Sequence, residues 1–151
     1  MTSILRRTTY IVEDIEKSIS FYRDGIGLNL LWQTETELNG SLPIGKSGDK
    51  IKFAAFNGAD PVVGMVAFMQ LLDYQKKPIS DISKLDTGNS ILVLGVENCR
   101  QIYKNINAMG AKIHKSPFEN SVTGRDGKKI NMFSMFAWDP NNIFLEINQR
   151  L

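Results

Sequence analysis

The sequence predicts an α+β fold built from two modules of the same βαβββ order. The first observation is a repeat: an apolar segment that ends in Val-Glu, then Asp or Asn, then an amphipathic helix occurs over residues 8–22 and again over 91–103. The second is that strand-like segments separated by turns follow each copy. A repeat of this length indicates two equivalent modules, and the place where they face each other is the expected binding site.

Length and composition are those of an ordinary globular protein. With 151 residues, 42% of them hydrophobic, the chain can bury one core, so we expect a single domain over 1–151. Within this domain we expect a first module over about 1–74, a linker over about 75–88 and a second module over about 89–151. The linker is predicted because this stretch is polar and shows no clear periodicity.

Charge and cysteine content exclude several functional classes. The formal net charge is only +2 and the basic residues are scattered, which argues against a nucleic-acid partner. No apolar run approaches about 18 residues, so we expect no membrane-spanning segment. Cys99 is the only cysteine, which rules out an internal disulfide and fits a reducing compartment. We therefore expect a cytoplasmic protein.

The first module begins with a strand predicted over residues 4–12, where β-branched residues cluster. Asp14 follows at the position of a helix N-cap, and apolar residues then recur at helical spacing. Gly25 and Gly27 are expected to end this helix, because glycine tolerates the left-handed conformation at a helix terminus. Three further strands are predicted over residues 28–37, 50–56 and 64–72.

The second module repeats this order. A strand is predicted over residues 91–96, Asn98 is the expected N-cap, and Gly110 is expected to end the helix. One face of that helix is apolar and predicted to be buried: Cys99, Ile102, Tyr103, Ile106 and Met109. Strands are then predicted over residues 112–118, 129–138 and 143–147, with turns at 126–127 and 139–142.

Two segments resemble a known family. Residues 12–28 contain the pattern Val-x-Asp-hydrophobic-x-x-Ser-x-x-Phe-Tyr, and residues 138–147 contain an Asp-Pro-Asn turn before a hydrophobic-Glu-hydrophobic strand. Both are similar to the vicinal oxygen chelate superfamily, which includes glyoxalase I, bleomycin-resistance proteins and extradiol dioxygenases; Asn142 stands where that family usually has glycine. The resemblance implies that the two modules form a paired half-barrel cup and that the protein is a homodimer.

The resemblance also implies four metal ligands, usually His and Glu or Gln, from the first and fourth strands of each module. In this chain those positions fall on Arg7, Ile91, Gln70 and Glu146, and Arg7 and Ile91 lie 84 residues apart, as do the two N-cap residues. Arginine stays protonated and isoleucine has no donor atom, so neither can ligate a metal. We therefore expect no cofactor, with a divalent metal held by Glu146 and Gln70 as the alternative.

Glu146 is the candidate catalytic residue, because the resemblance places its carboxylate inside the cup. The alternative is a glutamate that faces solvent or meets a structural cation. We expect an ion pair between Arg7 and Glu146, with side chains within about 6 Å, where a metal would otherwise lie. Arg7 and Gln70 are also candidate ligand-binding residues, although a surface arginine and an edge-strand glutamine are the ordinary alternatives.

Aromatic and methionine side chains on the late strands are candidates to line the cup. Alternation along a barrel strand sends some of them inward, although each alone is typical of plain core. The predicted ligand-binding set is Phe68, Met132, Phe136 and Trp138. His114 is the only histidine, so the two-His-one-carboxylate site of an extradiol dioxygenase is missing; we expect His114 to be a surface residue and Cys99 a packing residue.

These observations leave three functions open. The first is a glyoxalase- or bleomycin-resistance-like protein that binds a small amphipathic molecule in an apolar cup without a metal. The second is a lyase or isomerase of the same superfamily that uses Glu146 as a general base. The third is a metal-dependent glyoxalase-like lyase. Whether the protein is an enzyme stays open, and the expected partners are a small-molecule ligand and a second copy of the chain.

Overall fold

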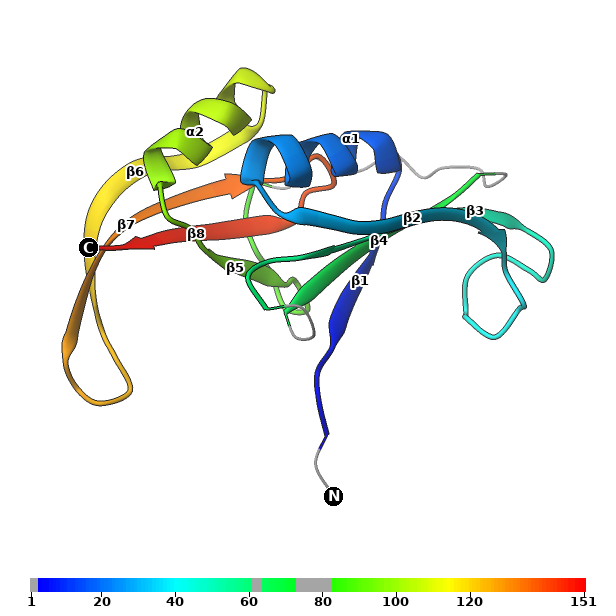
Figure 1. Cartoon of the computed structure of the whole chain (residues 1–151), viewed down its shortest axis with the longest axis horizontal. Helices are drawn as coiled ribbons and strands as arrows, with labels where there is room; N and C mark the ends of the chain where they lie inside the picture. The colour runs from blue at the N-terminus through cyan, green and yellow to red at the C-terminus, as the bar shows by residue number, and fades with distance from the viewer. Residues whose placement is uncertain (1–2, 61–63, 73–82) are drawn as a thin grey trace. The chain divides into compact units, whose positions relative to one another are not determined.

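The chain forms two four-stranded mixed sheets, each with its own helix (Figure 1). The structure is a computed structural model that describes residues 3–60, 64–72 and 83–151. The chain divides into two compact units, residues 1–79 and residues 80–151, and each is considered by itself.

The first unit has the order βαβββ. Its sheet has the strand order β1-β4-β3-β2, in which β1 is parallel to β4 and the other pairs are antiparallel. The elements are β1 (Arg7–Ile11), α1 (Ile15–Ser20), the π-helix η1 (Phe21–Ile26), β2 (Asn29–Glu37), β3 (Lys50–Asn57) and β4 (Met65–Leu71).

The second unit repeats this topology. Its strand order is β5-β8-β7-β6, again with one parallel pair, β5 with β8. The elements are β5 (Ile91–Gly95), α2 (Cys99–Ala108), β6 (Lys112–Thr123), β7 (Lys129–Trp138) and β8 (Phe144–Arg150). The predicted α+β class and the two βαβββ modules are thus confirmed. Residues 75–82 of the predicted linker lie outside the described residues, and 83–88 form neither helix nor strand.

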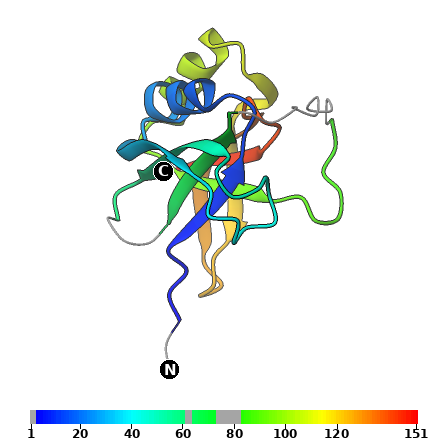
Figure 2. The same cartoon turned by 90° about the vertical axis from the view of Figure 1, so that its right-hand side faces the viewer.

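Strand lengths differ from the prediction at three places: β1 covers only Arg7–Ile11 of the expected 4–12. β6 continues to Thr123, beyond the expected end at residue 118, and β8 continues to Arg150. The added residues of β6 are polar and mostly exposed, so their sequence lacks the alternation of a half-buried strand. They are strand because they pair with β7 in a hairpin that projects beyond β5 and β8 (Figure 2).

Both helices begin at the predicted caps. The Oδ1 atom of Asp14 accepts hydrogen bonds from the backbone N–H groups of Glu16 and Lys17, at 3.1 and 3.2 Å. Asn98 Oδ1 accepts from the N–H of Gln101 at 2.9 Å. These side chains satisfy donors that the first helical turn leaves free. Glycines with positive φ follow the helical segments, Gly27 after η1 (φ 87°) and Gly110 after α2 (φ 77°), whereas Gly25 lies inside η1.

A glutamine ties the last strand of each unit to the start of its helix. In the first unit the Oε1 atom of Gln70 accepts a hydrogen bond from the Ile15 N–H at 2.9 Å. In the second unit Gln149 Oε1 accepts from the Cys99 N–H at 3.0 Å. The backbone contacts beside them also match, since Val12 N donates to Met69 O and Val96 N to Asn148 O. Gln70 and Gln149 are therefore equivalent positions of the two modules.

The core of each unit lies between its helix and one face of its sheet. In the first unit the ring of Tyr22 lies 4.6 Å from that of Phe68 and 6.3 Å from that of Phe56, centroid to centroid, and all three are fully buried. In the second unit the corresponding fully buried set is Cys99, Ile106, Met135, Leu145 and Ile147. The helix-covered face thus holds the largest fully buried side chains of both units.

The turn before β8 explains how asparagine replaces the usual glycine of the resemblance. Asn142 has a positive φ of 60°, and asparagine adopts this left-handed conformation more readily than other residues with a side chain. Asp139 Oδ1 accepts hydrogen bonds from the N–H groups of Asn141 and Ile143, both at 2.8 Å. The turn therefore keeps its shape without glycine. No helix in the described part of the chain is long and apolar enough to cross a membrane.

The two capping glutamines should contribute similarly to stability. Replacing Gln70 or Gln149 by methionine removes the acceptor and leaves a part-buried N–H without its bond, so each should lower the free energy of unfolding by about 1–3 kcal/mol in urea titrations. Gln70→Glu keeps an acceptor and should lose much less. Gln101→Met, on an exposed part of α2, is the matched control; an equal loss there would contradict the capping role.

Candidate functional site

Each sheet has a second face that its helix does not cover, which we call the helix-free face. In the first unit this face carries a cluster of buried apolar side chains from two central strands, packed with residues of the segment between β2 and β3. The cluster comprises Leu38, Ile51, Phe53, Ala55, Ala67, Met69 and Leu71, and Ile44 packs against it. This face of the first unit is therefore apolar and partly covered by its own chain.

Arg7 lies on the helix-free face of the first unit. Its guanidinium carbon is 5.0 Å from the ring centroid of Phe53, which is a cation–π distance. Trp32 approaches the same ring, with centroids 5.4 Å apart, and is 46% exposed. An arginine, a buried phenylalanine and a half-exposed tryptophan thus form one row. Glu146 belongs to the second unit, so the predicted Arg7–Glu146 ion pair stays a prediction.

Strand register corrects the position assigned to Gln70. Arg7 pairs with Met65, and the equivalent Ile91 pairs with Phe144, so the fourth strands are offset by 79 residues rather than 84. With this offset the residue that corresponds to Glu146 is Ala67, three residues before Gln70. Gln70 uses its side-chain oxygen to cap α1 instead. The repeat misplaced it because the segments between the first and fourth strands differ in length.

Phe68 lies on the helix-covered face, not in a cup. It is fully buried, and its ring contacts those of Tyr10, Tyr22 and Phe56. Neighbouring residues on a strand point to opposite faces, and Ala67 and Met69 belong to the helix-free cluster. We therefore correct the prediction that Phe68 lines a binding surface: it is a core residue beneath the helical segment.

Glu146 lies on the helix-free face of the second unit, at one end of a short hydrogen-bonded chain. Its Oε1 atom accepts a hydrogen bond from Asn148 Nδ2 at 2.8 Å. Asn148 Oδ1 in turn accepts from the hydroxyl of Ser134, at 2.7 Å, and Ser134 is fully buried. Asn148 and Ser134 were not predicted from the sequence. Asn148 could have been found from its position two residues after Glu146, because residues two apart on a strand share a face.

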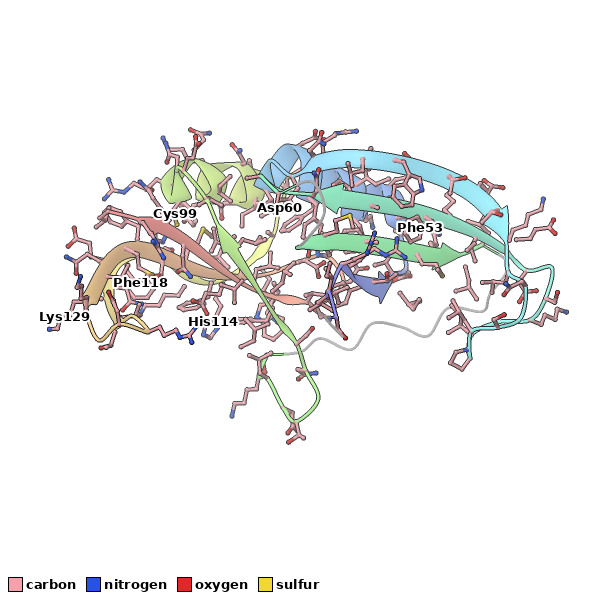
Figure 3. All side chains as sticks on the ribbon, turned by 60° about the horizontal axis from the view of Figure 1, so that its bottom comes forward. Phe53, Asp60, Cys99, His114, Phe118 and Lys129 are labelled. Carbon is pink, nitrogen blue, oxygen red and sulfur yellow. The ribbon has the colours of Figure 1, made fainter. Side chains whose placement is uncertain are left out.

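Aromatic rings surround this chain of polar groups. Phe136 pairs directly with Glu146 across the strands, and its ring stacks on that of Phe144 with centroids 5.8 Å apart and planes 10° apart. Phe118 and His114 extend the surface, at 6.0 Å from Phe136 and 5.6 Å from Phe144 respectively. Figure 3 shows both on the side of the sheet opposite α2 and Cys99.

Three of the predicted lining residues share the face of Glu146. Alternation along β7 places Met132, Phe136 and Trp138 on the side of Ser134. Trp138 is nearly buried and packs on Phe144, with ring centroids 4.8 Å apart, whereas Phe136 is part-exposed. Met132 and Trp138 therefore support the surface, and Phe136 is the one of the three that a molecule could contact most readily.

The residues at the family's metal positions do not fit a metal. The four positions are Arg7, Ala67, Ile91 and Glu146, and only Glu146 carries a donor that a divalent cation accepts. A transition metal needs three or four converging donors. Within residues 3–60, 64–72 and 83–151, no group of three or more His, Cys, Asp or Glu side chains is placed to hold an ion.

His114 and Cys99 occupy the environments expected of them. His114 is exposed and rests against the edge of the aromatic surface. Cys99 is fully buried at the start of α2, and its thiol lies 3.8 Å from the carbonyl oxygen of Ile147. Burial raises the pKa of the Cys99 thiol, which disfavours the reactive thiolate.

Comparison with known proteins supports the resemblance. The model of the Glyoxalase/Bleomycin resistance protein/Dioxygenase superfamily matches residues 4–147, which is nearly the whole chain. A comparison with curated protein sequences finds no match.

Solved structures of low sequence identity share the fold. A glyoxalase family protein from Bacillus cereus has a TM-score of 0.72 at 16% identity, with 100% of this chain and 96% of that chain covered. The trypanothione-dependent glyoxalase I of Leishmania major has a TM-score of 0.62 at 16% identity, with coverage of 98% and 87%. A virulence protein from Salmonella typhimurium has a TM-score of 0.55 at 19% identity, with coverage of 100% and 99%.

Cys99 should react with thiol reagents only after unfolding. We expect labelling by Ellman's reagent to be at least ~100-fold slower in the native protein than in denaturant, because access requires opening of the structure. Because the Cys99 thiol has a higher pKa in the folded protein than in the unfolded chain, it contributes to the free energy of unfolding in a pH-dependent way. This contribution should be fully present below the unfolded thiol's pKa of about 8.5 and should be lost as the pH rises toward the pKa of the folded thiol. Ser116→Cys in a Cys99→Ala background, at an exposed position, should label at once; equal rates for both sites would contradict burial.

The predicted Arg7–Glu146 ion pair can be tested by a double-mutant cycle. If it forms, Arg7→Gln and Glu146→Gln should be non-additive in the free energy of unfolding, with a coupling of about 0.5 kcal/mol or more. Arg6→Gln, at the neighbouring position, should combine additively with Glu146→Gln. Additivity in both cycles would mean that the ion pair does not form.

Proposed function

Because the chain belongs to the Glyoxalase/Bleomycin resistance protein/Dioxygenase superfamily, we propose that it binds a small amphipathic molecule without the family's metal. The observation that carries the proposal is the helix-free face of the second unit, where one carboxylate stands among aromatic rings. Apolar surface with a few polar groups that fix orientation is the usual character of a small-molecule site.

Absence of a metal in this proposal is supported by residue chemistry. Arginine, alanine and isoleucine at three of the four family positions cannot replace histidine or glutamate as ligands. The alternative of a metal held by Glu146 and Gln70 loses its second ligand, because the Gln70 oxygen caps α1. A ligand would therefore be held by hydrogen bonds, charge and aromatic contact rather than by coordination.

A second candidate is an enzyme that uses Glu146 as a general base. It is favoured by the hydrogen bonding of the carboxylate: among the described residues only Asn148 donates to it, at Oε1, which leaves Oε2 to take a proton from a substrate. The two candidates differ in what Glu146→Gln would do. A general base is required for turnover, whereas a binding anchor contributes only to affinity.

A cytoplasmic location and a homodimer complete the proposal. The location is supported by the single, buried Cys99, and the dimer by the family resemblance. Light scattering coupled to size-exclusion chromatography would test the dimer.

Metal content and ligand binding together test the proposal. Protein dialysed against zinc, nickel or iron should retain well below one equivalent by elemental analysis, and a thermal-shift screen of amphipathic compounds should give ligands that raise Tm equally with and without divalent metal. Stoichiometric metal would contradict the proposal, as would ligands that act only with metal.

Two variants then assign the role of Glu146. For any compound that the thermal-shift screen identifies, Glu146→Gln should weaken binding. If the protein also converts that compound, Glu146→Gln should abolish turnover. Glu119→Gln makes the same charge change on β6, where pairing with Phe133 places it on the other face of the sheet, and should leave both unchanged. Equal losses in the two variants would remove Glu146 from the site.

A further inference from the structure

We infer that the ligand of the second unit's helix-free face is an organic cation, an apolar body with a primary ammonium group that donates to Oε2 of Glu146. This inference rests on the proposed function and specifies the charge of its ligand. It depends on two independent features of the face: the direction of its hydrogen bonds and the electrostatics of its rings.

Hydrogen-bond direction follows from the buried end of the chain. The Ser134 hydroxyl donates to Asn148 Oδ1, so the NH₂ group of that amide points to Glu146 and donates to Oε1. In the described part of the chain Glu146 makes no other hydrogen bond, which leaves Oε2 as an acceptor. A carboxylate has only acceptor oxygens, so the group that it receives must be a donor.

Ring electrostatics select a cationic donor over a neutral one. Phe136 lies directly across the strands from Glu146, and Phe144 lies two residues before it on the same strand. The faces of aromatic rings are negative and attract cations. Lys115 Nζ lies 3.7 Å from the ring centroid of Phe118, so one ring of this face already contacts an ammonium group, and the like charge of Lys115 acts against a cationic ligand. The carboxylate and the ring faces both favour a positive charge on the ligand.

Partial burial strengthens this selection. Glu146 is only part-exposed, and the apolar residues beside it lower the local solvation of its charge. A cation that displaces the remaining water from Oε2 replaces the lost hydration with an attraction between opposite charges. An anion would instead place two negative charges next to each other. The residue across the parallel pair, Val93, is 59% exposed, so the apolar body has uncovered hydrocarbon to contact.

Asn148 is therefore a positioning residue for specificity. It fixes the carboxylate through Oε1 and is itself fixed by Ser134. Replacement of Asn148 by leucine would keep a side chain of similar size but remove the N–H donor. The carboxylate of Glu146 could then rotate. The result expected is a reduced preference for ammonium over neutral ligands rather than a loss of all binding.

Three probes of the same shape test the inference: 2-phenylethylammonium, 2-phenylethanol and 3-phenylpropionate. Binding is measured by NMR titration of the full chain, following the amides of β7 and β8. We expect the ammonium to bind at least about tenfold more tightly than the alcohol, and the propionate most weakly, since cation–π and charge terms act together. Glu146→Gln should bring the ammonium within about twofold of the alcohol, and Asn148→Leu should reduce the ratio partway.

The outcomes separate this inference from the proposed function. If the alcohol or the propionate binds the same amides as tightly as the ammonium, the face is a ligand site but the cation inference is wrong. If no probe shifts these amides, the site itself is wrong and the inference falls with it. Glu119→Gln, on the other face of the sheet, should leave the order of the three affinities unchanged, and a lost preference for the ammonium in this variant would overturn the inference.

Discussion

The parallel pairing of first and last strands in each unit is the constraint on which the other features depend. Parallel neighbours require a crossover, and here the crossover carries the helix back over one face of the sheet. Gln70 and Gln149 bind the start of that crossover to the last strand, because each accepts a hydrogen bond from the first N–H of its helix. Once this connection is set, alternation assigns every side chain of the sheet to the helix-covered or the helix-free face.

Local features could be predicted from the sequence because neighbouring residues determine them. The N-caps at Asp14 and Asn98, the stops at Gly27 and Gly110 and the asparagine turn at Asn142 depend on interactions within about five residues. Helical and strand periodicity likewise gave the βαβββ order of both modules. Family membership followed from two segments of this local kind.

Non-local register could not be predicted in the same way. The repeat relates first strands at an offset of 84 residues, but fourth strands are related at 79, since the intervening loops differ. An odd-numbered change of register moves a side chain to the other face, and in the observed register Phe68 lies on the helix-covered face. Ser134 and Asn148 were missed for a related reason: their contact joins β7 to β8 and appears only when the strands are paired.

The three residues without ligating atoms also bear on how this site could change. Arg7, Ala67 and Ile91 lie on β1, β4 and β5, so no one strand carries more than one of them. Within the second unit, Ile91→His would add one donor on the strand beside Glu146, which is fewer than the three or four donors that a transition metal needs. At Ala67, which is fully buried, the larger side chain would also disturb packing. At Ala67, a first step toward a metal site would therefore lower stability before enough donors are present to hold the ion.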